Sequence, residues 1–130
     1  MVDSTDYKKW LQRAQQDLKV IELINKEGIE GIEDTFCYLC QQAAEKYLKA
    51  FILYNNQLII KTHDLVYLLN ISKRYAEELK SLFDDVVLLN EYTISARYPS
   101  DFDDKRTVED ANLAYESLIN IKNAVEKLIK

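Results

Sequence analysis

Hydrophobic residues recur at intervals of three and four along most of the chain, the spacing that places them on one face of an α-helix. The first such segment runs from Tyr7 to Gly28, because a glycine is a natural helix stop. Ser4, Thr5 or Asp6 is the expected N-cap. The inward positions of this segment are Tyr7, Trp10, Leu11, Ala14, Leu18 and Ile21.

A second apolar stripe extends from Phe36 to Tyr54. Asp34 or Thr35 is the expected cap, and Asn55-Asn56 marks the end of the segment. The inward positions are Phe36, Leu39, Cys40, Ala43, Tyr47, Ala50, Phe51 and Tyr54.

Two further helices are predicted in the middle of the chain. A short helix begins after Thr62, its expected N-cap, and Asp64 lies in its first turn. A longer helix runs from about Ala76 to Tyr98, because the residue before Pro99 is disfavoured in the α conformation. The inward positions of the two helices are Leu65, Leu68 and Leu69, then Leu79, Leu82, Phe83, Val86, Leu89 and Thr93.

The last helix begins after Thr107, with Glu109 and Asp110 in its first turn and Lys127 and Lys130 at its end. This charge order suits the helix dipole. Its inward positions are Ala111, Ala114, Tyr115, Leu118, Ile121, Val125 and Leu128. Together the patterns predict an all-α fold, an up-and-down bundle of four main helices plus one short helix.

Composition supports this fold and narrows the function. The 130 residues suffice for a single domain, residues 1–130, and two glycines with one proline argue against most all-β architectures. Seventeen basic and 22 acidic residues give a net charge of −5. An acidic chain is a poor candidate for non-specific nucleic-acid binding, although a local basic patch is compatible with this balance.

The chain is expected to be cytoplasmic, because no segment approaches the ~20 apolar residues of a membrane span and the N-terminus is polar and acidic. Cys37 and Cys40 are then reduced. Both fall on the apolar stripe of the second helix, so we expect buried core thiols. The single histidine, His63, is far from them in sequence, and we expect no metal and no cofactor.

Ala96-Arg97-Tyr98-Pro99 closes the fourth segment and is the first candidate site. Arg97 lies at a predicted helix C-terminus, where a cation is favoured, and opens into the charged loop from Ser100 to Arg106. A guanidinium at such an edge can hold a phosphate or a carboxylate with two hydrogen bonds.

Two other polar stretches are candidates. Gln41, Glu45 and Lys49 are spaced by four, so they form one ridge that we interpret as a solvated face. Gln42 and Lys46 lie beside that ridge and can face a partner or a cleft of the bundle. His63 is either an ordinary residue of a helix-capping region or an acid–base group.

Taken in order, these motifs resemble the HEPN domain family, helical proteins often encoded beside minimal nucleotidyltransferases in prokaryotes. The resemblance covers most of the chain. It rests on Trp10 with Ala14 and Asp17-Leu18, Phe36 with the run from Gln41 to Ala50, Thr62-His63-Asp64-Leu65, and Ala96-Arg97-Tyr98-Pro99.

The resemblance implies a helical bundle that dimerises, with roles in toxin–antitoxin systems, RNA cleavage or nucleotide binding. Active HEPN ribonucleases are metal-independent and use an arginine followed, after four to six intervening residues, by a histidine. Two such motifs meet across the dimer, and cleavage leaves a cyclic phosphate. Arg97 matches the arginine, but this chain has Phe102, Asp103 and Asp104 where the histidine is expected.

Our leading hypothesis is therefore a non-catalytic HEPN protein that dimerises and binds a nucleotide or a nucleotidyltransferase partner through a cleft near Arg97. The candidate binding residues are Arg97, Tyr98, His63, Gln42 and Lys46. One alternative is a metal-independent endoribonuclease toxin that acts on RNA with Arg97 and His63. The other is a structural bundle in which Arg97 pairs with Asp101 or Asp103.

Overall fold

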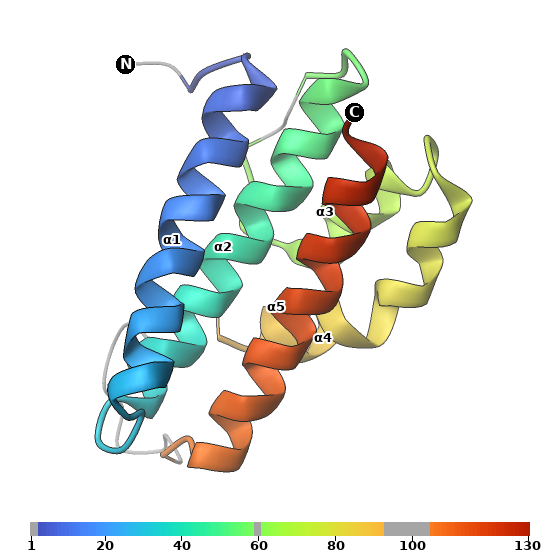
Figure 1. Cartoon of the computed structure of the whole chain (residues 1–130). Helices are drawn as coiled ribbons and strands as arrows, with labels where there is room; N and C mark the ends of the chain where they lie inside the picture. Colours follow the sequence, from blue (N-terminus) through green and yellow to red (C-terminus); the bar gives the residue numbers. More distant parts are fainter. Residues whose placement is uncertain (1–2, 59–60, 93–104) are drawn as a thin grey trace.

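The computed structural model describes residues 3–58, 61–92 and 105–130, and these residues form an all-α fold, as predicted. The order of helices is α1 (Tyr7–Glu27), α2 (Glu33–Tyr54), α3 (Leu65–Ser72), the 3₁₀-helix η1 (Glu77–Leu82), α4 (Phe83–Asn90) and α5 (Val108–Leu128). Figure 1 shows the long helices α1 and α2 running in opposite directions, whereas α2 and α5 run in the same direction. The shorter helices α3, η1 and α4 lie between α2 and α5 in the chain and make the crossing back.

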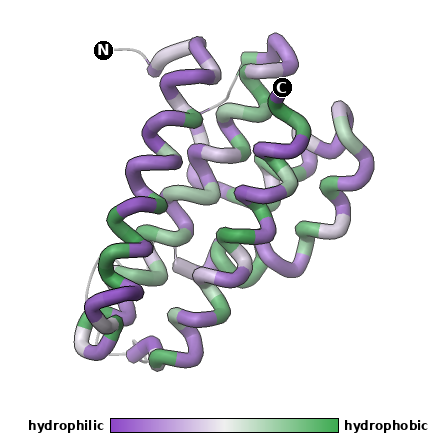
Figure 2. Tube along the Cα trace, viewed as in Figure 1, coloured by the Kyte–Doolittle hydropathy of each residue, from purple (hydrophilic) through white to green (hydrophobic). Residues whose placement is uncertain are grey.

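Helix α2 is the centre of the structure, because α1, α3, α4 and α5 all pack against it. Its buried residues accordingly occur on every side of the helix, the pattern expected of a helix enclosed by others. Apolar residues are concentrated where the helices face one another (Figure 2). The largest fully buried side chains are Tyr47, Phe36, Ile21, Leu48, Ile52, Leu65, Leu68, Leu69, Leu79, Leu89, Leu118 and Ile121.

The ends of α1 and α5 agree with the sequence prediction. Asp6 caps α1 by accepting from the backbone N–H of Lys8 at 2.9 Å, and Gly28, at φ +127°, ends it. Thr107 begins α5 in a capping box: its hydroxyl accepts from the Asp110 N–H at 3.1 Å, and the Asp110 carboxylate accepts from the Thr107 N–H at 2.8 Å.

Two predicted caps are wrong. Helix α2 begins at Glu33 after Ile32, which provides no side-chain cap, so neither Asp34 nor Thr35 has that role. Helix α3 is capped by Asp64 rather than by Thr62, because the Asp64 carboxylate accepts from the Val66 N–H at 3.0 Å. For α3, sequence alone did not distinguish Thr62 from Asp64, since aspartate and threonine are both good caps. For α2, cap preference was misleading, because the residue before the helix is an isoleucine.

The predicted helix from Ala76 to Tyr98 is also wrong within the described residues. It begins as the 3₁₀-helix η1, and α4 ends at Asn90; the remainder of the prediction, from Thr93 onward, lies outside the described residues. A 3₁₀-helix has three residues per turn, so it changes the angular register of the apolar face. Leu79 and Leu82 are buried, but Phe83, predicted to face inward, is 48% exposed.

Both cysteines are buried and free in the core, as predicted. Burial raises the pKa of the Cys37 thiol to about 11 and raises the pKa of Cys40 as well. Both thiols are therefore protonated at neutral pH and behave as small hydrophobic groups. Within residues 3–58, 61–92 and 105–130, no helix is long and apolar enough to span a membrane.

The central position of α2 predicts a large stability cost for Leu48→Ala, because Leu48 is fully buried. We expect the free energy of unfolding to fall by about 2–5 kcal/mol, the range for removing a core leucine side chain. Leu58→Ala is the matched control, since Leu58 is 80% exposed, and its change should stay within about 0.5 kcal/mol. Urea denaturation measures both, and equal losses would contradict the assignment of α2 as the core helix.

Candidate functional site

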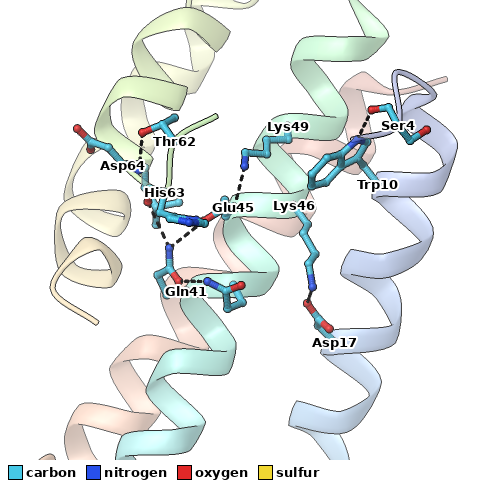
Figure 3. Close-up of polar contacts among 12 residues, drawn as sticks. Ser4, Trp10, Asp17, Gln41, Glu45, Lys46, Lys49, Thr62, His63 and Asp64 are labelled. Atoms are coloured by element: carbon cyan, nitrogen blue, oxygen red, sulfur yellow. Dashed lines mark hydrogen bonds and ion pairs between the residues drawn. The ribbon is translucent and has the colours of Figure 1, made fainter. Parts of the chain in front are cut away.

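A chain of polar side chains lies within the otherwise apolar interior around α2 (Figure 3). Gln41, Glu45 and Lys49 are each at least nine-tenths buried. The prediction that they form a solvated face is wrong, because the segment before α3 and the start of α1 cover this side of α2. Buried polar groups at this depth require partners, so their contacts decide what the ridge does.

Glu45 is the residue on which the contacts converge. One carboxylate oxygen lies 2.9 Å from the ammonium group of Lys49, and the other lies 2.8 Å from Nδ1 of His63. The amide of Gln41 donates to the same oxygen as His63 at 3.4 Å. An unpaired carboxylate at this depth would be costly, whereas these three partners satisfy it.

His63 joins the buried ridge to the surface. Its ring is 56% exposed, although Nδ1 contacts a carboxylate that is 6% exposed. Nδ1 is thus the ring nitrogen that faces the buried carboxylate of Glu45. The backbone carbonyl of His63 also accepts from the Gln41 amide at 3.4 Å.

Neighbouring residues hold the His63 segment in place. The hydroxyl of Thr62 accepts from the Asp64 N–H at 3.1 Å, one residue either side of the histidine. Asn90, at the end of α4, donates to Asp64 at 3.0 Å and accepts from the Leu65 N–H at 2.9 Å. The histidine is therefore attached to α2 by its ring and to α4 through the residues that follow it.

Lys49 is held on two sides. Its ammonium group lies 2.9 Å from Glu45 and 5.2 Å from the centre of the Trp10 ring, a cation–π distance. The Trp10 indole N–H donates to the backbone carbonyl of Ser4 at 2.7 Å, so it also ties down the chain that precedes α1. Figure 3 shows Lys49 between the glutamate and the indole.

A pocket of about 300 Å³ opens beside this ridge, and we call it the His63 pocket. Its lining residues are Asp3, Lys49, Lys61, Thr62 and His63. Lys49 is already paired with Glu45, so Lys61 and His63 are the lining groups that can attract an anion, against one aspartate. Lys49 and His63 also contact Glu45, as Gln41 does, and we call these four residues the Glu45 cluster. Their mutual contacts make part of the lining rigid.

A larger pocket, of about 430 Å³, lies at the start of α2 and is lined by residues 31–35 with Lys105 and Arg106. Glu33 and Asp34 there balance the two basic residues in formal charge. Asp34 also accepts from the backbone N–H of Arg106 at 3.1 Å. Because its lining acids and bases match in number, this pocket has no net preference for an anion.

The other predicted site residues are distributed differently. Lys46 pairs with Asp17 of α1 at 2.6 Å, and Gln42 donates to Gln41 at 2.7 Å, so neither lines the His63 pocket. Arg97 and Tyr98 lie outside the described residues. The assignment of these residues to a binding site stays a prediction.

Sequence reasoning missed Glu45 and Lys49 as site residues. Their spacing by four was visible, and Glu45 followed by Lys49 is a favourable helical ion pair. The same spacing is typical of exposed helix surfaces, so it carries no information about burial. The one further sequence signal was the single histidine, whose imidazole could serve as a partner for a carboxylate.

The buried pair predicts that Lys49→Met destabilises the protein. We expect a loss of about 3 kcal/mol in the free energy of unfolding, at the lower end for removing one partner of a buried pair, because His63 and Gln41 still contact Glu45. The double variant Glu45→Leu/Lys49→Met should recover most of that loss, since no unpaired charge remains. Urea denaturation measures both variants.

Lys80→Met is the control for this experiment, because Lys80 pairs with Glu77 at 3.3 Å on the exposed surface of η1. Exposed pairs contribute at most about 1 kcal/mol. A Lys49→Met variant no less stable than Lys80→Met would contradict the interpretation of Lys49 as a buried charge partner.

Comparison with known proteins agrees with this fold. The family model of the HEPN domain matches residues 7–128. The crystal structure of ST0689, an archaeal HEPN homologue, is similar with a TM-score of 0.74 and 22% sequence identity, covering 96% of this chain and 98% of that chain. None of the curated proteins matches significantly. Since the family model spans nearly the whole sequence, the chain belongs to the HEPN domain family.

Proposed function

We propose that the protein is a non-catalytic HEPN domain that forms a homodimer and binds a nucleotide through its phosphate groups in the His63 pocket. One observation carries the proposal: Lys49 from α2 lines the same pocket as Lys61 and His63 from the segment before α3. Three nitrogen-bearing side chains thus meet in a space of about 300 Å³. Membership of the HEPN family supports the dimer.

Charge and size both favour a small anion over a long one. The chain carries a net charge of −5, which opposes the many phosphate contacts of non-specific RNA binding. A compact basic pocket within an acidic protein instead selects a ligand whose charge is concentrated, and lysines are suitable point charges for phosphate. The pocket volume lies at the lower end of the range of small-molecule sites.

The sequence after Arg97 supports binding rather than cleavage. In active HEPN ribonucleases a histidine is expected where this chain has Phe102, Asp103 and Asp104. Aspartate is ionised at neutral pH and repels a phosphate. We therefore propose Arg97 and Tyr98 as binding residues, and not as half of a cleavage motif.

We also propose that the homodimer associates with a minimal nucleotidyltransferase within a toxin–antitoxin module. Family membership supports this partner, because the resemblance implies proteins that are often encoded beside such enzymes. Co-expression of the protein with the product of its neighbouring gene, followed by size-exclusion chromatography with light scattering, measures both associations. A monomer that elutes apart from that product would contradict both.

One observation favours a second function, a metal-independent endoribonuclease that uses Arg97 and His63. The 2.8 Å contact between Glu45 and Nδ1 of His63 orients an exposed imidazole in the way that a carboxylate orients a catalytic histidine. Nε2 would then exchange a proton with a ribose hydroxyl while Arg97 stabilises charge on the phosphate.

The binding proposal predicts that Lys61→Ala and His63→Ala each weaken ATP binding about tenfold or more, since the first removes a charge-assisted contact and the second a hydrogen-bonding ring nitrogen. Isothermal titration calorimetry with ATP, and with pyrophosphate as a smaller probe, measures the affinities. Lys80→Ala is the control, because Lys80 pairs with Glu77 and does not line the pocket. Absence of binding to both probes, or equal affinity in all variants, would overturn the proposal.

The non-catalytic assignment predicts that the purified homodimer leaves RNA intact in the presence of EDTA. Incubation with a labelled oligoribonucleotide, followed by electrophoresis and analysis of product ends, measures cleavage. Cleavage that leaves a cyclic phosphate and disappears in both His63→Ala and Arg97→Ala would establish the ribonuclease instead. Lys80→Ala serves again as the matched surface control.

A further inference from the structure

We infer that Glu45 is a positioning residue, whose buried carboxylate fixes the tautomer and the ring orientation of His63 and leaves Nε2 as the nitrogen available to the occupant of the His63 pocket. The role of Nε2 toward a ligand rests on the proposed function. The positioning itself rests on the contacts of Glu45 and is testable without any ligand.

The side chain of Glu45 is held from several sides. Its carboxylate is 6% exposed and is held at one oxygen by Lys49 at 2.9 Å and at the other by Gln41 at 3.4 Å. Gln41 is fully buried and also donates to the carbonyl of His63. A carboxylate with these fixed partners has few alternative rotamers, so it is preorganised to hold the imidazole.

The ring of His63 is held at one of its two nitrogens. A ring that is 56% exposed would ordinarily rotate and exchange tautomers in water, but its Nδ1 lies 2.8 Å from Glu45. Because an ionised carboxylate only accepts, this contact selects the form with the proton on Nδ1. The backbone on both sides is held by the Thr62–Asp64 hydrogen bond and by Asn90, so the ring has a fixed point of attachment.

Glu45 and Lys49 form a buried pair whose charges offset each other, so the interior part of the cluster is neutral. Nε2 of His63 then determines which hydrogen bond the ring can offer a ligand. An unprotonated Nε2 accepts a hydrogen bond from a hydroxyl, and a protonated Nε2 donates one to a phosphate oxygen.

The test uses the fact that the sequence contains one histidine. Long-range ¹H–¹⁵N correlation spectra of the uniformly ¹⁵N-labelled protein therefore report the two ring nitrogens of His63 without assignment ambiguity. At a pH where the ring is neutral, the wild-type protein should show a protonated Nδ1 and an unprotonated Nε2. The opposite pattern in the wild-type protein would overturn the inference.

Variants separate positioning from a structural role. In Glu45→Leu/Lys49→Met, which leaves no unpaired buried charge, the ratio of the Nδ1–H to the Nε2–H form should fall at least about tenfold, as expected for loss of a charge-assisted hydrogen bond. Lys49→Met keeps the carboxylate and should keep the wild-type tautomer. An unchanged tautomer in the double variant would overturn the inference.

Glu45→Gln provides a second measurement where the double variant fails to fold. A neutral amide oxygen is a weaker acceptor than a carboxylate, so the Nδ1–H form should decrease but persist. An unchanged ratio in Glu45→Gln would count against Glu45 as the positioning residue. ATP titration of the same samples distinguishes the two proposals. A fixed tautomer without ATP binding contradicts only the nucleotide-binding function. ATP binding with an unfixed tautomer contradicts only the positioning role of Glu45.

Discussion

The ion pair between Glu45 and Lys49 is the constraint on which the rest of the structure depends. Helix α2 is enclosed by α1, α3, α4 and α5, yet it carries two charged side chains that are each more than nine-tenths buried. Each charge is tolerated because the other lies 2.9 Å away and further partners occupy the remaining positions. The segment before α3 must therefore bring His63 to Glu45, and α1 must bring Trp10 to Lys49.

This requirement links the core to the candidate site. The same contacts that satisfy the buried charges place His63 and Lys49 at the wall of one pocket. Rigid placement matters for binding, because side chains ordered by folding lose less entropy when a ligand arrives. Figure 3 shows the consequence: polar groups from α2 and the segment before α3 converge, while Lys46 is directed to α1. The pairing of Lys46 with Asp17 makes it a link between helices.

Much of the fold could be predicted from the sequence. Apolar spacing identified α1, α2 and α5, and Asp6, Gly28 and Thr107 marked their ends through local backbone chemistry. The fourth segment could not be predicted in the same way. Its apolar spacing fits one continuous α-helix, but η1 has three residues per turn and α4 has 3.6, so the same spacing points in different directions in the two helices. In the candidate site, the sequence indicated His63, because it is the only histidine. It did not indicate its partner Glu45, which we predicted to lie on a solvated face.

The sequence by itself determined the all-α class, both ends of α1, the start of α5, the buried cysteines and the resemblance to the HEPN family, since each depends on residues close together in the chain or on motifs in order. The tertiary structure alone decided which polar residues are inside. Burial of Gln41, Glu45 and Lys49 depends on what packs against α2 from distant parts of the chain, and helical periodicity is the same for an exposed ridge and for an enclosed one.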